Sequence, residues 1–200
     1  LSYFIPSISA FSDEYYYAKM ARSFFFNQEF SIHGIQGMVY PPLYSIVLSV
    51  SYMFNDMQIV YFFMKLINAL ISTTVIIPIY FLGKEFMDAK KSILLALLVA
   101  VIPSTFSFAP YLMAENLLYP VSIAAIYFIY KAFTYYNTKY FVLAGMFIAF
   151  ALLVKLISIV LVVLPILFFI AILLIQKSFL KNLFKKIFLL YSVLALIILP

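Results

Sequence analysis

The sequence predicts an all-α protein that crosses a membrane several times, and its composition and apolar pattern lead to this fold class. Of its 200 residues, 67% are hydrophobic and 10% are charged, and the mean hydropathy is +1.14. A soluble domain carries roughly a quarter charged residues on its surface. Apolar runs of the length of membrane helices recur along the chain. The composition therefore excludes a soluble enzyme, a coiled coil and a disordered chain.

The placement of the charges explains the formal net charge of +6 without an anionic partner. Most lysines flank apolar runs, as expected of charges that set membrane topology, so membrane lipids and no nucleic acid are the predicted surroundings. The chain has no cysteine, which excludes disulfides and thiol catalysis. His33 is the one histidine, which argues against a zinc site.

Residues 1–56 are too polar and too interrupted to cross a bilayer, and we expect a loop that contains short helices. Ser12 stands before two acidic residues, where its side chain is placed to cap the first helix. Residues 43–54 are apolar, but they are shorter than the roughly 20 residues of a spanning helix. We therefore expect an interfacial or re-entrant helix there, after the turn at residues 40–42.

Apolar runs beyond residue 56 predict a bundle of transmembrane helices. The predicted spans are residues 57–82, 93–108, 117–133, 140–154, 156–175 and 187–200. Several of these runs are shorter than about 20 residues, so tilt or local thinning of the bilayer is expected. The chain begins with Leu1 and ends at Pro200 inside an apolar run, which predicts a fragment of a longer protein.

Lysines fall in alternate loops and predict which loops face the cytoplasm. The positive-inside rule places the loops around residues 84–91, 131–139 and 177–186 in the cytoplasm. Residues 1–56 and 109–116 and the turn at Lys155 then share the opposite, extracytoplasmic side. Asp13, Glu14 and Glu115 would meet on that face, unless residues 43–54 span the bilayer and move the first loop to the cytoplasm.

Several motifs, in order, resemble one family of membrane enzymes. The run from Asp13 to Arg22 and the later Tyr40-Pro41-Pro42-Leu43-Tyr44 resemble the first extracytoplasmic loop of the GT-C glycosyltransferases. The closest resemblance is to the branch that contains the protein O-mannosyltransferases and the lipid A aminoarabinose transferases. It continues through Leu82-Gly83-Lys84, residues 114–119 and residues 144–155. The aminoarabinose transferases carry a Glu-Lys pair before the proline of the turn, where this chain has Val39-Tyr40, so that assignment is weakened.

The resemblance implies an enzyme whose active site lies on the extracytoplasmic face. Its catalytic carboxylate corresponds to Asp13, with Glu14 beside it. Its donor is a sugar on a polyprenyl phosphate, transferred with inversion to a hydroxyl of a protein, lipid or glycan acceptor. An acceptor hydroxyl loses its proton as it attacks, and a carboxylate such as Asp13 can take that proton.

The phosphate leaving group in such a reaction needs positive charge near it. Lys19, Arg22 and Lys155 are the cations predicted on the same side of the membrane. Lys155 is embedded in an apolar stretch, where a lysine either serves a function or snorkels to the interface. Tyr40 and Tyr44 either line a donor groove or belong to the aromatic belt.

Glu115 has three interpretations that the sequence leaves open. It orients the acceptor, joins Asp13 in binding a divalent cation, or caps the helix that follows. Oxygen ligands would suit magnesium or manganese, and the sequence does not establish that a metal is needed.

Two classes compete with an enzyme: a transporter or lipid-handling protein that binds an ion or head group, and a membrane subunit whose charges only set topology. The acids lie in loops and no internal repeat is visible, which favours chemistry on a lipid-borne substrate over transport.

Overall fold

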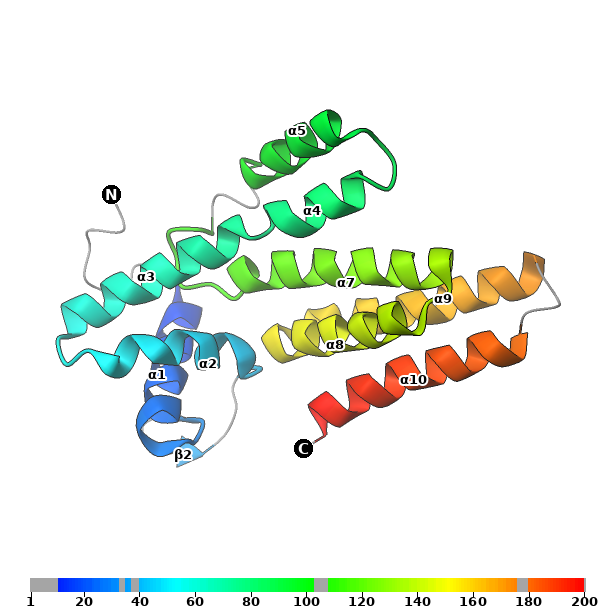
Figure 1. Cartoon of the computed structure of the whole chain (residues 1–200). Helices are drawn as coiled ribbons and strands as arrows, with labels where there is room; N and C mark the ends of the chain where they lie inside the picture. The colour runs from blue at the N-terminus through cyan, green and yellow to red at the C-terminus, as the bar shows by residue number, and fades with distance from the viewer. Residues whose placement is uncertain (1–10, 33–34, 37–39, 103–107, 176–179, 200) are drawn as a thin grey trace. The chain divides into compact units, whose positions relative to one another are not determined.

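A computed structural model describes residues 11–32, 35–36, 40–102, 108–175 and 180–199, so His33 lies outside the described residues. The chain divides into two compact units, Leu1–Pro120 and Val121–Pro200. Figure 1 shows that helices dominate both units.

The N-terminal part of unit 1 contains the short helices that the sequence predicts, together with a hairpin that it did not. The elements are α1 (Ser12–Asn27), β1 (Ser31–Ile32), β2 (Ile35–Gln36), α2 (Leu43–Ser49) and the 3₁₀-helix η2 (Val50–Met53). The strands pair antiparallel, with Ser31 opposite Gln36. In Figure 1, α1 runs across α2. The Tyr52 hydroxyl of η2 donates to the carbonyl of Ala18 at 2.9 Å and joins η2 to α1.

The start of α1 differs by one residue from the sequence-based prediction. Ser12 is the first helical residue instead of the cap, and its hydroxyl donates to Oδ1 of Asp13 at 3.5 Å. The cap position belongs to Phe11, whose N–H donates to Oε1 of Glu14 at 3.3 Å. A glutamate that reaches back to the amide before the helix satisfies a donor that the helix cannot.

The remaining helices of unit 1 are α3 (Met57–Thr73), α4 (Ile76–Gly83) and α5 (Ala89–Ala100). Asp56 caps α3 by accepting the N–H of Gln58 at 2.7 Å. A short break separates α3 from α4, and α4 packs against α5 as a helical hairpin (Figure 1). The helix α5 begins at Ala89, before the predicted span of residues 93–108, because Asp88 caps it by accepting the N–H of Lys91. Residues 103–107 of that predicted span lie outside the described residues.

Unit 2 is an assembly of long apolar helices. They are α7 (Glu115–Tyr135), which begins in unit 1, α8 (Thr138–Val154), η3 (Leu156–Ser158), α9 (Ile159–Ile175) and α10 (Leu180–Ile198). The core between α8 and α10 includes Phe141, Ile148 and Leu190. The backbones approach closely at Gly145, where an added Cβ would lie 2.5 Å from the carbonyl oxygen of Leu190. Only glycine fits this contact without a shift.

The helix α10 begins at Leu180, before the predicted span of residues 187–200. Leu183 and Ile187 are buried one turn apart, while Lys185 is exposed. The first turns of α10 contain lysines, so a search for continuous apolar runs does not include them. They are helical because one face of an amphipathic helix can still be buried.

Within the described residues, three helical stretches are long and apolar enough to span a membrane. They are Met57–Gly83, Glu115–Tyr135 and Leu156–Leu174. Large apolar side chains are exposed on these and neighbouring helices, for example Leu94 on α5 and Leu167 on α9. In water such surfaces would be unfavourable, whereas lipid accepts them. The predicted all-α polytopic membrane fold is confirmed.

Candidate functional site

The first turn of α1 presents Asp13 as a half-buried carboxylate held by one tyrosine. The Tyr40 hydroxyl donates to Oδ1 of Asp13 at 2.8 Å. Burial, and then the hydrogen bond to Asp13, raise the pKa of Tyr40 to about 12, so this phenol stays a donor at physiological pH. Among the described residues, no group donates to the other oxygen of Asp13, Oδ2. Tyr40 therefore orients the carboxylate and leaves one oxygen available.

Glu14, the next residue, is fully buried and its carboxylate is occupied by backbone amides. Oε1 accepts the N–H of Phe11 at 3.3 Å, and Oε2 accepts the N–H of Leu112 at 3.1 Å. Lys65 of α3 also interacts electrostatically with Glu14. A buried carboxylate needs such partners because its desolvation is costly. Glu14 thus joins α1 to the segment before α7.

Lys65 of α3 is buried, with 1% of its surface exposed. Its stem lies in the helix that the sequence predicts as a span, but the amine is buried inside unit 1. The attraction to Glu14 offsets part of the cost of burying its charge.

Asn68, one turn beyond Lys65 on α3, connects three parts of unit 1. Its Oδ1 accepts the hydroxyl of Tyr44 at 2.7 Å. Its Nδ2 donates to the carbonyls of Ala109 at 2.9 Å and Tyr111 at 2.7 Å. Tyr44 is completely buried, and burial raises the pKa of its phenol well above the usual value. The prediction that Tyr44 lines a substrate groove or the aromatic belt was therefore wrong.

Tyr17 of α1 is a buried tyrosine whose pKa responds to both acidic segments. Burial, and then the negative charges of Glu115 and Asp13, raise the pKa of Tyr17. Its ring is 5.0 Å from that of Tyr40, and its hydroxyl is buried with no hydrogen-bond partner among the described residues. The hydrogen bond from the Leu112 amide to Glu14 brings the first turn of α1 to the segment before α7. The convergence of Asp13, Glu14 and Glu115 on one membrane face stays a prediction.

Glu115 is the first residue of α7, and the segment before it is held by Asn116. The Asn116 side chain donates to the carbonyls of Phe108 at 2.8 Å and Met113 at 3.1 Å. In the part of the chain that the structure describes, no group of three or more histidine, cysteine, aspartate or glutamate side chains could hold a metal. A magnesium or manganese site at Asp13 and Glu115 stays a prediction.

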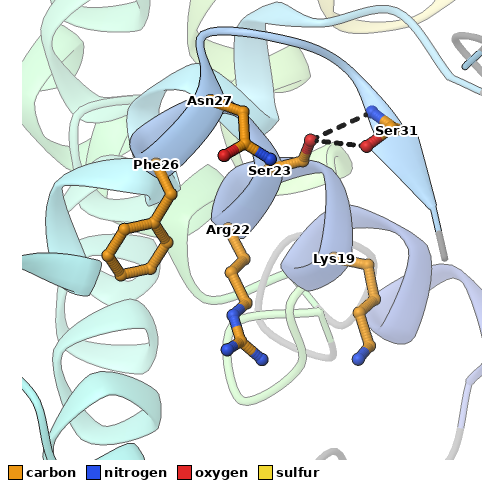
Figure 2. A pocket seen from close by; sticks show the side chains of 6 residues that line it. All are labelled: Lys19, Arg22, Ser23, Phe26, Asn27 and Ser31. Carbon is orange, nitrogen blue, oxygen red and sulfur yellow. Dashed lines mark hydrogen bonds between the residues drawn. The ribbon is translucent and has the colours of Figure 1, made fainter. Parts of the chain in front are cut away.

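Lys19 and Arg22 line an open pocket of about 330 Å³ on another face of α1 (Figure 2). Ser23, Phe26, Asn27 and Ser31 complete the lining. An α-helix turns about 100° per residue, so Arg22 points about 180° away from Asp13 around the axis of α1. Arg22 therefore does not lie on the same face of α1 as Asp13. The role of Lys19 and Arg22 beside a leaving phosphate stays a prediction.

Lys155 ends α8 in unit 2, in an extended backbone conformation between α8 and η3. Its N–H donates to the carbonyl of Ala151 at 3.0 Å, and its side chain is partly exposed. Its role in phosphate binding stays a prediction.

Sequence reasoning missed Tyr17, Lys65 and Asn68 as members of the site. Two polar residues three positions apart in an apolar helix, as at Lys65 and Asn68, are a signal for a buried polar face. The hydrogen bond from the Leu112 amide has no signal in the sequence, because every residue except proline carries an N–H group.

Residues 40–200 match the family model described as dolichyl-phosphate-mannose-protein mannosyltransferase. The fold is similar to the crystal structure of ArnT from Cupriavidus metallidurans in the apo state, with a TM-score of 0.75 and 17% sequence identity. That similarity covers 100% of this chain and 38% of the ArnT chain. No curated protein has a significant sequence match.

Proposed function

We propose that this chain, which belongs to the dolichyl-phosphate-mannose-protein mannosyltransferase family and has the helical membrane fold of the GT-C enzymes, carries the catalytic base of a membrane glycosyltransferase. The donor is a sugar on a polyprenyl phosphate, with mannose as the first candidate from the family description. The acceptor is a hydroxyl group on a protein, lipid or glycan.

One observation carries the assignment of the base. Asp13 is half-buried at the start of α1, with one oxygen fixed by Tyr40. Glu14 beside it is completely buried, and both of its oxygens accept backbone amides. A general base must reach the proton that it removes, so Asp13 takes this role and Glu14 positions the segment that carries Glu115.

In the proposed step, the acceptor oxygen attacks the anomeric carbon of the sugar. The new carbon–oxygen bond forms as the bond from that carbon to the phosphate oxygen breaks, with inversion. The acceptor proton moves to Asp13, and the bonding electron pair leaves with the polyprenyl phosphate. Glu115, at the start of α7, orients the acceptor in this proposal.

The test is sugar transfer by the full-length protein in membranes, with radiolabelled polyprenyl-phosphate mannose as the first donor. Asp13→Asn keeps an oxygen that can accept the Tyr40 hydroxyl and removes the negative charge. We expect transfer to fall by roughly 10²- to 10⁴-fold, which is the usual contribution of a general base.

Asp56→Asn is the matched control, because Asp56 caps α3 and asparagine caps a helix equally well. It should retain full transfer. Undiminished transfer by Asp13→Asn at equal expression would remove Asp13 from the mechanism, and absence of transfer by the wild type from every polyprenyl-phosphate donor would reject the reaction class.

The proposed extracytoplasmic site can be tested separately in intact cells. The chain has no cysteine, so single substitutions report their own accessibility against the unsubstituted protein. Asn55→Cys, at an exposed position before α3, should react with a membrane-impermeant maleimide from outside. Lys90→Cys, exposed at the start of α5, should react only after the cells are opened. The reverse pattern would place the Asp13 site in the cytoplasm.

A further inference from the structure

The polar pocket beside α1 combines two cations with neutral hydrogen-bonding groups and no acid. Lys19 and Arg22 lie one turn apart on α1 and contribute their side chains to the same side of the pocket in Figure 2. Ser23, Asn27 and Ser31 add hydroxyl and amide groups. These are the groups that bind phosphate oxygens in proteins.

The pocket is held in shape by bonds that do not use its cations. The Ser23 hydroxyl is hydrogen-bonded to the Ser31 hydroxyl at 2.8 Å and accepts the Ser31 N–H at 3.2 Å. These bonds, drawn in Figure 2, fix the start of β1 against α1. The binding groups are therefore positioned before any ligand arrives, which lowers the entropy cost of binding.

The two cations have no counter-ion within the ranges that the structure describes. The ion pair found there joins Lys91 to Asp88, and neither Lys19 nor Arg22 forms one. Like charges one turn apart on a helix repel each other. Lys19 lies 5.4 Å from the centre of the Tyr15 ring, and this contact does not neutralise its charge. An anion in the pocket would remove the repulsion.

Exposed apolar side chains lie at the rim of the pocket and favour an anion that belongs to a lipid. Phe26 lines the pocket and is 61% exposed, and Met53 of η2 is 64% exposed nearby in the same unit. A second, smaller pocket also has Lys19 and Arg22 in its lining and adds Met57 and Tyr61 of α3, the helix predicted to enter the membrane. Cationic groups next to exposed apolar side chains are typical of sites for lipid head groups.

We propose that the pocket formed by Lys19, Arg22, Ser23 and Asn27 binds a phosphate group, carried on the head group of an anionic membrane lipid or free in solution. Arg22 points away from Asp13 around α1, and Asp13 does not line the pocket. A bound lipid would hold the face of α1 that carries Lys19 and Arg22 at the membrane surface. The opposite face of α1 carries Asp13. The inference does not depend on glycosyl transfer.

The test measures binding by the purified full-length protein in neutral detergent. Phosphatidylglycerol, phosphatidylcholine, glycerol phosphate and inorganic phosphate are each titrated, and binding is followed by the rise in Tm and by native mass spectrometry. The variant is Lys19→Gln with Arg22→Gln, which retains polar side chains of similar length. The control is Lys90→Gln with Lys139→Gln, which removes the same charge from two exposed positions outside the pocket.

We expect phosphatidylglycerol to bind the wild type and the control at least tenfold more tightly than it binds the variant, and phosphatidylcholine to show no such difference. That result identifies the lipid as the source of the phosphate. Saturation by inorganic phosphate or glycerol phosphate, lost in the variant, identifies a free phosphate instead.

Equal binding of every phosphate compound to the variant and the wild type, or no binding to the wild type, would overturn the proposal. Arg22→Lys keeps the charge and loses the two-pronged guanidinium. Arg22→Lys should therefore bind phosphatidylglycerol with an affinity between those of the wild type and the double variant. Because it keeps the charge, it also tests the proposal if the double variant fails to fold. Sugar transfer plays no part in these measurements, so their failure would leave the assignment of Asp13 untouched.

Discussion

Glu14 accepts a hydrogen bond from the backbone N–H of Leu112 at 3.1 Å, across 98 residues of chain. The contact is completely buried at Glu14 and joins the first turn of α1 to the segment that leads into α7. Asp13 precedes Glu14 in the chain and Glu115 follows Leu112, so this bond joins the two segments that carry the Asp13 and Glu115 carboxylates.

Replacing Glu14 with glutamine should destabilise unit 1 by about 2–3 kcal/mol. The amide retains one accepting oxygen, so one of the two backbone amides loses its acceptor, and Lys65 loses the negative charge that interacts with it. Thermal unfolding of the full-length protein in detergent measures the loss. Glu29→Gln at an exposed position is the control and should change Tm little. An unchanged Tm for Glu14→Gln would show that the buried contact contributes nothing.

Tyr17→Phe and Tyr52→Phe should shift the free energy of unfolding in opposite directions. The Tyr17 hydroxyl is buried with no partner in the described part of the chain, so its removal should be neutral or stabilise by about 1 kcal/mol. The Tyr52 hydroxyl donates to the Ala18 carbonyl at 2.9 Å, and its removal should destabilise by about 1 kcal/mol. Chemical denaturation without substrate compares the two. Destabilisation by Tyr17→Phe would reveal a hydrogen bond to its hydroxyl.

Tyr40 should make the folded state sensitive to alkali. The pKa of Tyr40 is raised from 10.0 to about 12 by burial and the bond to Asp13, whereas the unfolded chain titrates near the ordinary value. The folded state holds this proton more tightly, so the stabilisation is complete below about pH 10 and is lost as pH rises toward about 12. Tm measured between pH 8 and 11 should fall less steeply in Tyr40→Phe than in the wild type. Parallel curves would contradict the assignment.

Gly145→Ala should separate α8 from α10 and destabilise unit 2. The new Cβ would lie 2.5 Å from the Leu190 carbonyl oxygen, a backbone atom that cannot move alone. Overpacking of this kind costs about 1–3 kcal/mol. Gly83→Ala is the comparison, because its Cβ would meet the Ser92 side chain at 3.2 Å, where a small shift relieves the contact. Equal losses of Tm in the two variants would show that the approach at Gly145 is not limiting.

Local patterns in the sequence predicted much of the architecture. The interrupted segment before residue 57 predicted short helices, and α1 and α2 confirm them. Helix ends were less accurate, since Asp88 starts α5 earlier than its apolar run, and one buried face lets α10 begin among lysines. A hydropathy pattern detects residues that contact lipid and does not detect the charged turns that extend a helix beyond them.

The candidate site was predictable only in part. Asp13, Glu14 and Glu115 were identified from loop sidedness and motif order, but their different environments were not. Asp13 retains an accessible oxygen, whereas Glu14 is closed off by the amides of Phe11 and Leu112. Two neighbouring acids in a sequence look alike, and only the packing around each one distinguishes them.

The sequence by itself determined that the protein is helical and membrane-embedded, because apolar content and lysine spacing act through the solvent and need no knowledge of long-range contacts. Only the tertiary structure decided that Lys65 and Tyr44 are buried and that Lys19 and Arg22 line one pocket. Burial and direction depend on which distant segment packs against each helix face. That choice is made by contacts such as the one between Glu14 and the Leu112 amide.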